Sequence, residues 1–222
     1  MGVTKTDFMR GMQCPKMLWL DKHRPEEKVI PPEIQEKLDA GNEFGDKAMA
    51  IFGEYVEVTT FKTSGALDYK AMIEKTKECL DEGVGVICEG SFTYYNNFCA
   101  VDILRKVEGG YELYEVKNSP EVKEQFVQDL AFQRYLVARC GVKIVKCFVI
   151  YHGEDEENPF VIEEVTARVR EYYKWIDDNI WRLGKIKFQK EEIERPMGEH
   201  CCSPYECWYI NYCSKKEKEY GL

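Results

Sequence analysis

The sequence predicts an α/β fold in which a mixed sheet is flanked by helices, with an appendage that joins the two ends of the chain. The middle of the chain, residues 86–117, has the period of strands, whereas the segments around it space their apolar residues as helices do. A further strand-like run at residues 143–152 follows a helical segment, which is an order typical of mixed sheets. Cysteines near both termini indicate the appendage.

A chain of 222 residues with 44% apolar and 32% charged residues is typical of one soluble globular domain. No run approaches the roughly 18 consecutive apolar residues of a membrane span, and residues 1–7 lack the apolar core of a signal peptide. We therefore expect a cytoplasmic protein with no membrane partner. The net charge of −9 disfavours general attraction to nucleic-acid phosphates, although a local basic groove or bound metal ions are compatible with it.

Four helices are expected before the strands. Thr4 and Asp7 form a capping-box signal that begins the first helix, and a second short helix carries residues 14–20. The pair Pro31-Pro32 suits the first turn of a longer helix that reaches about residue 52. The fourth helix is expected over residues 68–82, where apolar side chains recur at helical spacing.

Three strands are expected to form a meander in the middle of the chain, at residues 86–95, 98–107 and 111–117. Asn96-Asn97 and Gly109-Gly110 separate these strands and are typical of hairpin turns. Consecutive strands joined by tight turns pair antiparallel, so the second strand should lie between the first and the third.

The rest of the chain alternates between helix and strand. Residues 119–121, Ser-Pro-Glu, offer an N-cap, a proline in the first turn and an acidic residue, and so predict a helix to about residue 140. A strand at residues 143–152 and an amphipathic helix at residues 166–184 follow. From residue 196 onward the tail is expected to be irregular and rich in cysteine.

Two carboxylates and a lysine are expected to meet on the meander. Asp102 lies on its second strand, and Glu115 and Lys117 lie two residues apart on one face of its third strand. Paired carboxylates are the hard oxygen ligands that Mg²⁺ or Mn²⁺ prefers, and the Val116 carbonyl is a natural further ligand. Lys117 could orient an attacking water or offset charge on a phosphate, while the metal lowers the pKa of that water.

A simpler interpretation of these residues is a cross-strand salt bridge on a solvated face. The helix that follows favours the metal site, because it carries polar side chains where it should pack on the sheet: Gln128, Asp129, Gln133 and Tyr135. Asp129 and Gln133 share one face of that helix, since they are four residues apart. An ordinary solvated stripe would give the same pattern.

Ten cysteines are many for a reducing compartment, where metal binding or burial is expected rather than disulfides. Five of them lie in apolar patterns and are expected to be core thiols: Cys79, Cys88, Cys99, Cys140 and Cys147. Three others, Cys201, Cys207 and Cys213, lie in the tail, with Cys202 as an alternative to Cys201. Thiolates in an irregular segment suit an iron–sulfur cluster or Zn²⁺, with Cys14 as the fourth ligand.

These motifs together resemble the PD-(D/E)XK nuclease superfamily. The matching pattern is Asp102, twelve intervening residues, Glu115-Val116-Lys117, and Gln133 on the next helix. The RecB-like branch, which includes nucleases of CRISPR adaptation, is the most similar. The resemblance implies a restriction-endonuclease-like core that hydrolyses phosphodiesters with one or two Mg²⁺ or Mn²⁺ ions, and it makes Gln133 a residue that orients the site.

The chain departs from the RecB-like pattern at two places. The branch carries a Gly-x-x-x-His motif whose histidine joins the metal, and here Gly45 occupies the histidine position. Glu43 or Asp46 could replace that ligand. The branch also favours Gln-x-x-x-Tyr on the later helix, whereas here Gln133 is followed by Val137 and Tyr135 is out of register.

One remote N-terminal cysteine with three C-terminal ones is the arrangement of iron–sulfur RecB-like nucleases. The resemblance therefore implies a 4Fe-4S cluster on Cys14, Cys201, Cys207 and Cys213, with Zn²⁺ as the alternative. The cluster would be structural and would tie both termini over the core. A single nuclease domain is expected over residues 1–222, with a core of about 31–190 and cluster-binding segments of about 4–24 and 196–216.

The expected function is a Mg²⁺- or Mn²⁺-dependent DNA nuclease, most readily an exonuclease on single-stranded or frayed ends, because no base-reading module is present. The resemblance places it in CRISPR adaptation, repair or recombination, with DNA and possible protein partners in such a complex. The alternative is a nuclease-like scaffold or DNA-binding subunit without activity. A third interpretation is a protein with a structural Zn²⁺ site and no nuclease role.

Overall fold

A six-stranded mixed sheet forms the centre of the computed structural model, which describes residues 2–155 and 159–220. The spatial order of the strands is their order along the chain. The first and second strands pair parallel, as do the fourth and fifth, and the other neighbours pair antiparallel. The strands are β1 (Val56–Glu57), β2 (Val86–Tyr94), β3 (Asn97–Val107), β4 (Gly110–Lys117), β5 (Ile144–His152) and β6 (Phe160–Glu164). The expected α/β class with a mixed sheet is confirmed.

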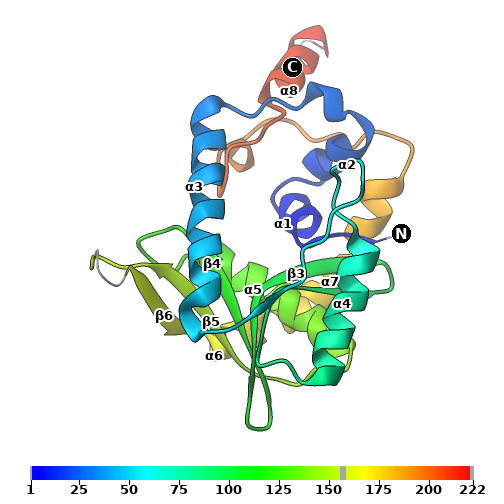
Figure 1. Ribbon diagram of the computed structural model, residues 1–222. Coiled ribbons are helices and arrows are strands. Elements are labelled where there is room, and N and C mark those ends of the chain that lie inside the picture. Colours follow the sequence, from blue (N-terminus) through cyan, green and yellow to red (C-terminus); the bar gives the residue numbers. More distant parts are fainter. Residues whose placement is uncertain (1, 156–158, 221–222) are drawn as a thin grey trace.

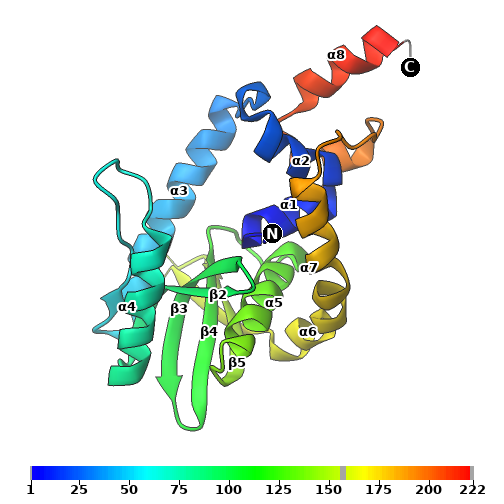
Figure 2. The same ribbon diagram turned by 90° about the vertical axis from the view of Figure 1, so that its right-hand side faces the viewer.

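Helices cover this sheet and build a second lobe above it (Figures 1 and 2). The α-helices are α1 (Lys5–Gln13), α2 (Pro15–His23), α3 (Pro32–Ala48), α4 (Tyr69–Glu82), α5 (Glu124–Arg139), α6 (Thr166–Glu171), α7 (Tyr173–Phe188) and α8 (Ile210–Tyr220). Short 3-10 helices lie at η1 (Pro25–Glu27), η2 (Met49–Phe52) and η3 (Glu199–Cys201). Figure 1 shows α3 running from the lobe that holds α1, α2 and α8 down to the sheet. Within the described residues, no helix is long and apolar enough to cross a membrane.

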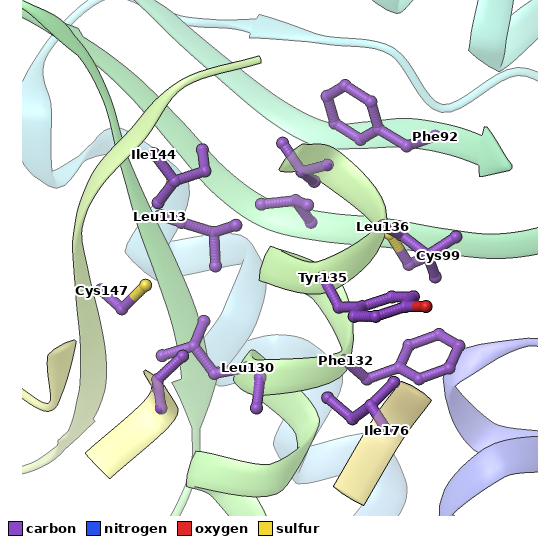
Figure 3. Close-up of a cluster of buried hydrophobic side chains, with 14 of the residues drawn as sticks. Phe92, Cys99, Leu113, Leu130, Phe132, Tyr135, Leu136, Ile144, Cys147 and Ile176 are labelled. Carbon is purple, nitrogen blue, oxygen red and sulfur yellow. The ribbon is translucent and has the colours of Figure 1, made fainter. Parts of the chain in front are cut away.

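The main core lies between the sheet and α5, with α1 and α7 packed behind it. Figure 3 shows Leu130 and Leu136 of α5 near side chains of the sheet such as Leu113 and Cys99, whereas Phe132 lies beside Ile176 of α7. A smaller apolar cluster covers the other face, where η2 packs on the sheet. Both faces of the sheet therefore contribute side chains to buried clusters.

Four of the five expected core thiols are buried: Cys79, Cys88, Cys99 and Cys147. Burial raises the pKa of the Cys147 thiol to about 12, so it remains protonated at neutral pH. The expectation for Cys140 was wrong, because this residue caps the C-terminus of α5 and is exposed.

The hairpin turns lie one residue earlier than expected. Tyr94 pairs with Asn97, so the β2–β3 turn consists of Tyr95 and Asn96, which adopt left-handed φ angles of 47° and 64°. Two left-handed residues are what a type I′ hairpin requires. Asn97 instead begins β3, and its Oδ1 accepts a hydrogen bond from the backbone of Val3 at 3.0 Å.

The expected start of the fifth helix was wrong. α5 begins at Glu124, after Lys123, rather than at Ser119. The carbonyl of Ser119 accepts a hydrogen bond from the backbone of His152 at 2.9 Å, and its hydroxyl donates to the carbonyl of Glu121 at 3.0 Å. These contacts hold residues 119–121 as a bend beside the end of β5, so the local helix signal is overridden.

Three further differences come from short or interrupted elements. The sheet gains β1 and β6 at its two edges, and neither was expected. The helix predicted over residues 166–184 is divided at Tyr172 into α6 and α7. The tail is not irregular throughout, because α8 occupies its last part.

A glycine at the start of β4 is required by close backbone packing. Gly110 has a φ of +156°, and a Cβ there would lie 2.4 Å from the Lys143 carbonyl oxygen, which already accepts the Tyr111 N–H at 2.9 Å. We expect Gly110→Ala to lower the free energy of unfolding by about 2 kcal/mol or more. The matched change Gly109→Ala, at φ +83° in open space, should cost only about 1 kcal/mol. Urea unfolding of both variants measures the difference, and equal losses would contradict the role of packing.

Candidate active site and thiol cluster

The antiparallel meander brings the carboxylates of Asp102 and Glu115 together on adjacent strands. The Val116 N–H donates a hydrogen bond to Asp102 Oδ2 at 2.7 Å, so the carboxylate takes the place of a strand partner. Glu115 is fully buried. The motif residues thus meet in the interior, at the edge of the α5 contact, rather than on a solvated face of the sheet.

Three side chains surround the Glu115 carboxylate. Lys117 Nζ lies 2.6 Å from Oε1, and Lys5 Nζ lies 2.9 Å from Oε1 and 3.2 Å from Oε2. Gln133 of α5 donates from Nε2 to Oε2. Lys117 also contacts Asp129 Oδ2, at 3.0 Å, so the expected polar face of α5 does turn toward the strand motif.

The electrostatics of Glu115 follow from these contacts. Burial alone would raise its pKa, but Lys117 and Lys5 outweigh burial and hold the pKa of this carboxyl at about 2. The pKa of Lys117 is likewise raised well above its ordinary value, because Glu115, Asp129 and Asp102 oppose the effect of burial. At neutral pH the ionised Glu115 carboxylate therefore lies between the ammonium groups of Lys117 and Lys5.

A third carboxylate, Glu89 of β2, was missed by the sequence analysis. Cys88 pairs with Ile103 and Gly90 with Val101, so Glu89 lies opposite Asp102 between these two pairs. Its φ of +57° is a strained conformation for a residue with a side chain, and such strain persists where the surroundings demand it. The available signal was a lone acidic residue, followed by glycine, inside an otherwise apolar strand.

Three carboxyl groups gather where Glu89, Asp102 and Glu115 approach one another. Burial, then the neighbouring Asp102, raises the pKa of Glu89 to about 8, and burial followed by Glu115 raises that of Asp102 to about 6. The Gln133 Oε1 atom is buried without a hydrogen-bond partner. Clustered acids whose protonation is favoured, beside an orphaned acceptor, fit a site that a divalent cation and its waters would complete.

The site formed by Glu89, Asp102, Glu115 and Lys117 is called the carboxylate centre below. It forms the floor of a cavity of about 1200 Å³. Its walls come from four parts of the chain: α3, the segment after β1, residues 118–126 between β4 and the first turn of α5, and the tail near Tyr205. The residues of α3 that line it are Ile34, Lys37, Leu38, Gly41, Asn42, Gly45 and Asp46. A second hollow of about 280 Å³ also reaches Lys5, Glu89 and Asp102.

Glu43, expected as a metal ligand, is not brought to this centre. Its side chain is 70% exposed, pairs with Lys47 at 2.7 Å and does not line the cavity. Gly45 and Asp46 do line the cavity from α3. The position where the RecB-like branch carries histidine therefore faces the cavity, but a glycine occupies it.

Gln128 and Tyr135 of α5 also lie apart from the centre. Gln128 approaches the hydroxyl of Tyr172 at 3.4 Å, and Tyr135 donates to Asp177 at 2.6 Å. Both residues therefore join α5 to the helices behind it.

The four cysteines named for a cluster gather in one apolar pocket of the upper lobe. Cys14, Cys201 and Cys207 are buried there with Trp19 and Tyr209, and Cys213 packs against them. Burial, with smaller contributions from the three other thiols, raises the pKa of the Cys207 thiol to about 11. Cys202 is exposed, so the geometry favours Cys201 over its neighbour.

The donor set fits an iron–sulfur cluster in chemistry, since four thiols share a buried pocket. No group of three or more His, Cys, Asp or Glu side chains within residues 2–155 and 159–220 is arranged as a ready single-ion site. A four-iron cluster is larger than one ion, so its ligands need not converge on a point.

One helix connects the thiol pocket to the carboxylate centre. Lys5 begins α1, while Cys14 follows its last residue. Gln13, at the C-terminal end of α1, donates to the carbonyls of His200 and Tyr205 at 2.8 Å and 2.6 Å. α1 thus contacts the centre at one end and holds the tail loop over the cavity at the other.

Comparisons with known proteins assign no family. No protein-family model and no curated protein sequence matches the chain. The fold is similar to a solved structure of SSO0001, with 11% identity over 86% of this chain and 87% of that one, and a TM-score of 0.40. It is also similar to an alkaline exonuclease (LHK-Exo) from Laribacter hongkongensis, with 12% identity, coverages of 84% and 90%, and a TM-score of 0.47.

A third similar structure is described as a candidate exonuclease from Eubacterium rectale, with 12% identity, coverages of 65% and 69%, and a TM-score of 0.32. These identities and TM-scores assign no activity to the chain. Its function has to come from the chemistry of the site.

Proposed function

We propose that this protein is a metal-dependent nuclease that hydrolyses DNA from single-stranded or frayed ends. The observation that carries the proposal is the convergence of Asp102, Glu115 and Lys117, together with Glu89, at the floor of one large cavity. The same convergence supports placing the chain in the PD-(D/E)XK superfamily. Carboxylates beside a fixed ammonium group are suited to hydrolysing a phosphodiester, in which negative charge builds on oxygen.

Asp102, Glu115 and Glu89 would hold the Mg²⁺ or Mn²⁺, with the Val116 carbonyl as a further ligand. When bound, such an ion supplies a water of lowered pKa and polarises a phosphoryl oxygen. Lys117 is held between Glu115 and Asp129, where its ammonium group can orient that water or offset charge on the phosphate. Gln133 keeps the Glu115 carboxylate in place through the hydrogen bond from its Nε2 atom.

The walls of the cavity support a single strand as substrate. Phe61 and Tyr205, which are 63% and 52% exposed, line the cavity and offer faces on which unpaired bases can stack. Lys37 and Lys123 also line it and are suited to contact phosphates. Because α3, residues 118–126 and the tail loop all line the cavity, a strand entering by its free end suits the site better than a duplex.

We further propose that Cys14, Cys201, Cys207 and Cys213 hold a 4Fe-4S cluster, with Zn²⁺ as the alternative. The shared pocket of these thiols supports this assignment. Such a cluster would tie both ends of a single 222-residue nuclease domain together, as iron–sulfur RecB-like nucleases do. The wider setting, in CRISPR adaptation, repair or recombination, rests on the resemblance of the motifs.

Cleavage of end-labelled single-stranded DNA in Mn²⁺, by protein prepared without oxygen, tests the proposal. We expect wild-type protein to degrade a linear strand and to spare a closed single-stranded circle. Asp102→Asn and Lys117→Met should each lower the rate by about 10³-fold, roughly 4 kcal/mol of transition-state stabilisation. The matched change Glu163→Gln, on the exposed edge strand β6, should leave the rate within about twofold of wild type.

Each other outcome has a distinct meaning. Cutting of the circle would identify an endonuclease and remove the need for a free end. A folded protein that binds Mn²⁺ yet cuts neither substrate would indicate a scaffold. Equal cleavage by Asp102→Asn and wild type would show that the activity belongs to a contaminant or to another site.

A further inference from the structure

Lys5 reaches the carboxylate centre from the opposite end of the chain. It is the first residue of α1, and a capping box between Thr4 and Asp7 fixes this helix start. Its Nζ atom contacts both Glu115 oxygens, at 2.9 Å and 3.2 Å, across 110 positions of sequence. No motif of the sequence marks this lysine, because its partner is so remote.

Lys5 and Lys117 differ in how firmly they are held. Lys117 bridges two acids, Glu115 and Asp129, whereas the contacts of the Lys5 ammonium group are with Glu115. Glu115 has Lys117 and Gln133 as partners in addition. Lys5 is therefore the more easily displaced of the two cations beside this carboxylate.

The charges of the centre indicate what Lys5 does there. Glu89, Asp102 and Glu115 bring three carboxyl groups to one place on adjacent strands, and Lys5 places its ammonium group directly on Glu115. An ammonium group and a divalent ion repel each other at such short range. A cation bound by these carboxylates would thus compete with Lys5 for Glu115.

We propose that the Lys5 ammonium group occupies a cation position of the carboxylate centre and leaves Glu115 when a divalent metal ion binds. Lys5 then sets the metal affinity of the site and keeps the centre compact while it is empty of metal. The inference rests on the proposed function, since it assumes that these carboxylates hold a metal.

The structure leaves room for this movement. The Lys5 side chain is 21% exposed and lines both the large cavity and the second hollow of about 280 Å³. A lysine stem has four rotatable bonds, so its ammonium group can turn into either space while α1 stays in place. In the large cavity the displaced group would meet the phosphates of an entering strand.

Binding of Mn²⁺, followed by electron paramagnetic resonance of the free ion, tests the proposal without relying on activity. We expect Lys5→Met to bind Mn²⁺ at least about tenfold more tightly than wild type, about 1.4 kcal/mol. Lys5→Arg, which keeps the charge, should stay within about threefold of wild type. Lys123→Met removes the same charge from the wall of the same cavity, and its affinity should change by less than about twofold.

Two arms separate failure of this inference from failure of the proposed function. If Mn²⁺ binding by wild type is absent or is not abolished by Asp102→Ala, the metal site itself is refuted. If wild type binds through Asp102 and Lys5→Met binds equally or more weakly, the site stands and the role of Lys5 is overturned.

A measurement on wild-type protein covers the case in which Lys5→Met does not fold. With lysines labelled by ¹⁵N at Nζ, the ammonium resonance that Lys5→Arg removes should shift saturably as Mg²⁺ is added. A resonance of Lys5 that Mg²⁺ leaves unchanged, while the site is saturated, would contradict its displacement.

Discussion

Glu89→Gln is expected to stabilise the metal-free protein by about 2–4 kcal/mol at pH 8 and to change its stability little at pH 4. Burial and the neighbouring Asp102 raise the folded-state pKa of Glu89 to about 8, from an ordinary value of 4.5. The folded protein therefore holds this proton more tightly than the unfolded chain does. The bound proton stabilises the folded protein fully below pH 4.5, the ordinary pKa of glutamate. This stabilisation is lost as the pH rises through 8, the pKa in the folded protein.

Glutamine removes this loss because it has the shape of the protonated acid and cannot ionise. Urea unfolding in a chelating buffer, at pH 4, 6 and 8, measures the effect. The control Glu163→Gln, at a half-exposed position of the edge strand β6, should change stability by less than about 0.5 kcal/mol at each pH. Equal stabilisation by Glu89→Gln at pH 4 and pH 8 would show that the pKa of the Glu89 carboxyl is not raised in the folded protein.

Cys207→Ser is expected to abolish iron binding, from about four irons per chain to none. Cys207 is buried in the thiol pocket with Cys14 and Cys201, and Cys213 packs against them. Without the cluster, no bound group connects α2 to the tail through the apolar pocket. We therefore expect a lower melting temperature as well. Iron and sulfide analysis of protein prepared without oxygen, with thermal unfolding, measures both effects.

Two cysteines provide matched controls for this change. Cys202→Ser alters the exposed neighbour of a proposed ligand, and Cys79→Ser alters a buried thiol outside the pocket. Both should keep their iron. Loss of iron in Cys202→Ser would move the ligand to that position, and zinc in place of iron in wild type would overturn the cluster while retaining a thiol site.

The meander shows how far local pattern predicts this fold. Its strands alternate, its turns carry asparagine and glycine, and each tight turn dictates an antiparallel neighbour, so β2, β3 and β4 could be predicted nearly to the residue. The start of α5 could not be, because the carbonyl of Ser119 is used by His152, which lies on another strand. β1 has only two residues, too few to show a period.

The candidate site divides in the same way. Spacing along adjacent strands places Asp102, Glu115 and Lys117 together, and helical spacing brings Gln133 to the same centre. Glu43 was misplaced because a helix presents only part of its surface to the cavity, and its side chain lies on the exposed part. For the tail cysteines, spacing could not choose between Cys201 and Cys202 as a ligand. In the structure Cys201 is buried and Cys202 is exposed, which favours Cys201.

The sequence by itself determined the class of fold, the carboxylate–lysine motif and the group of tail thiols, because period and spacing act over a few residues. Only the tertiary structure decided that Glu89 and Lys5 join that motif. Glu89 depends on a left-handed backbone angle opposite Asp102, and Lys5 depends on the packing of α1 over the sheet. Contacts between residues so remote in sequence are set by the burial of whole elements, and no local pattern carries that information.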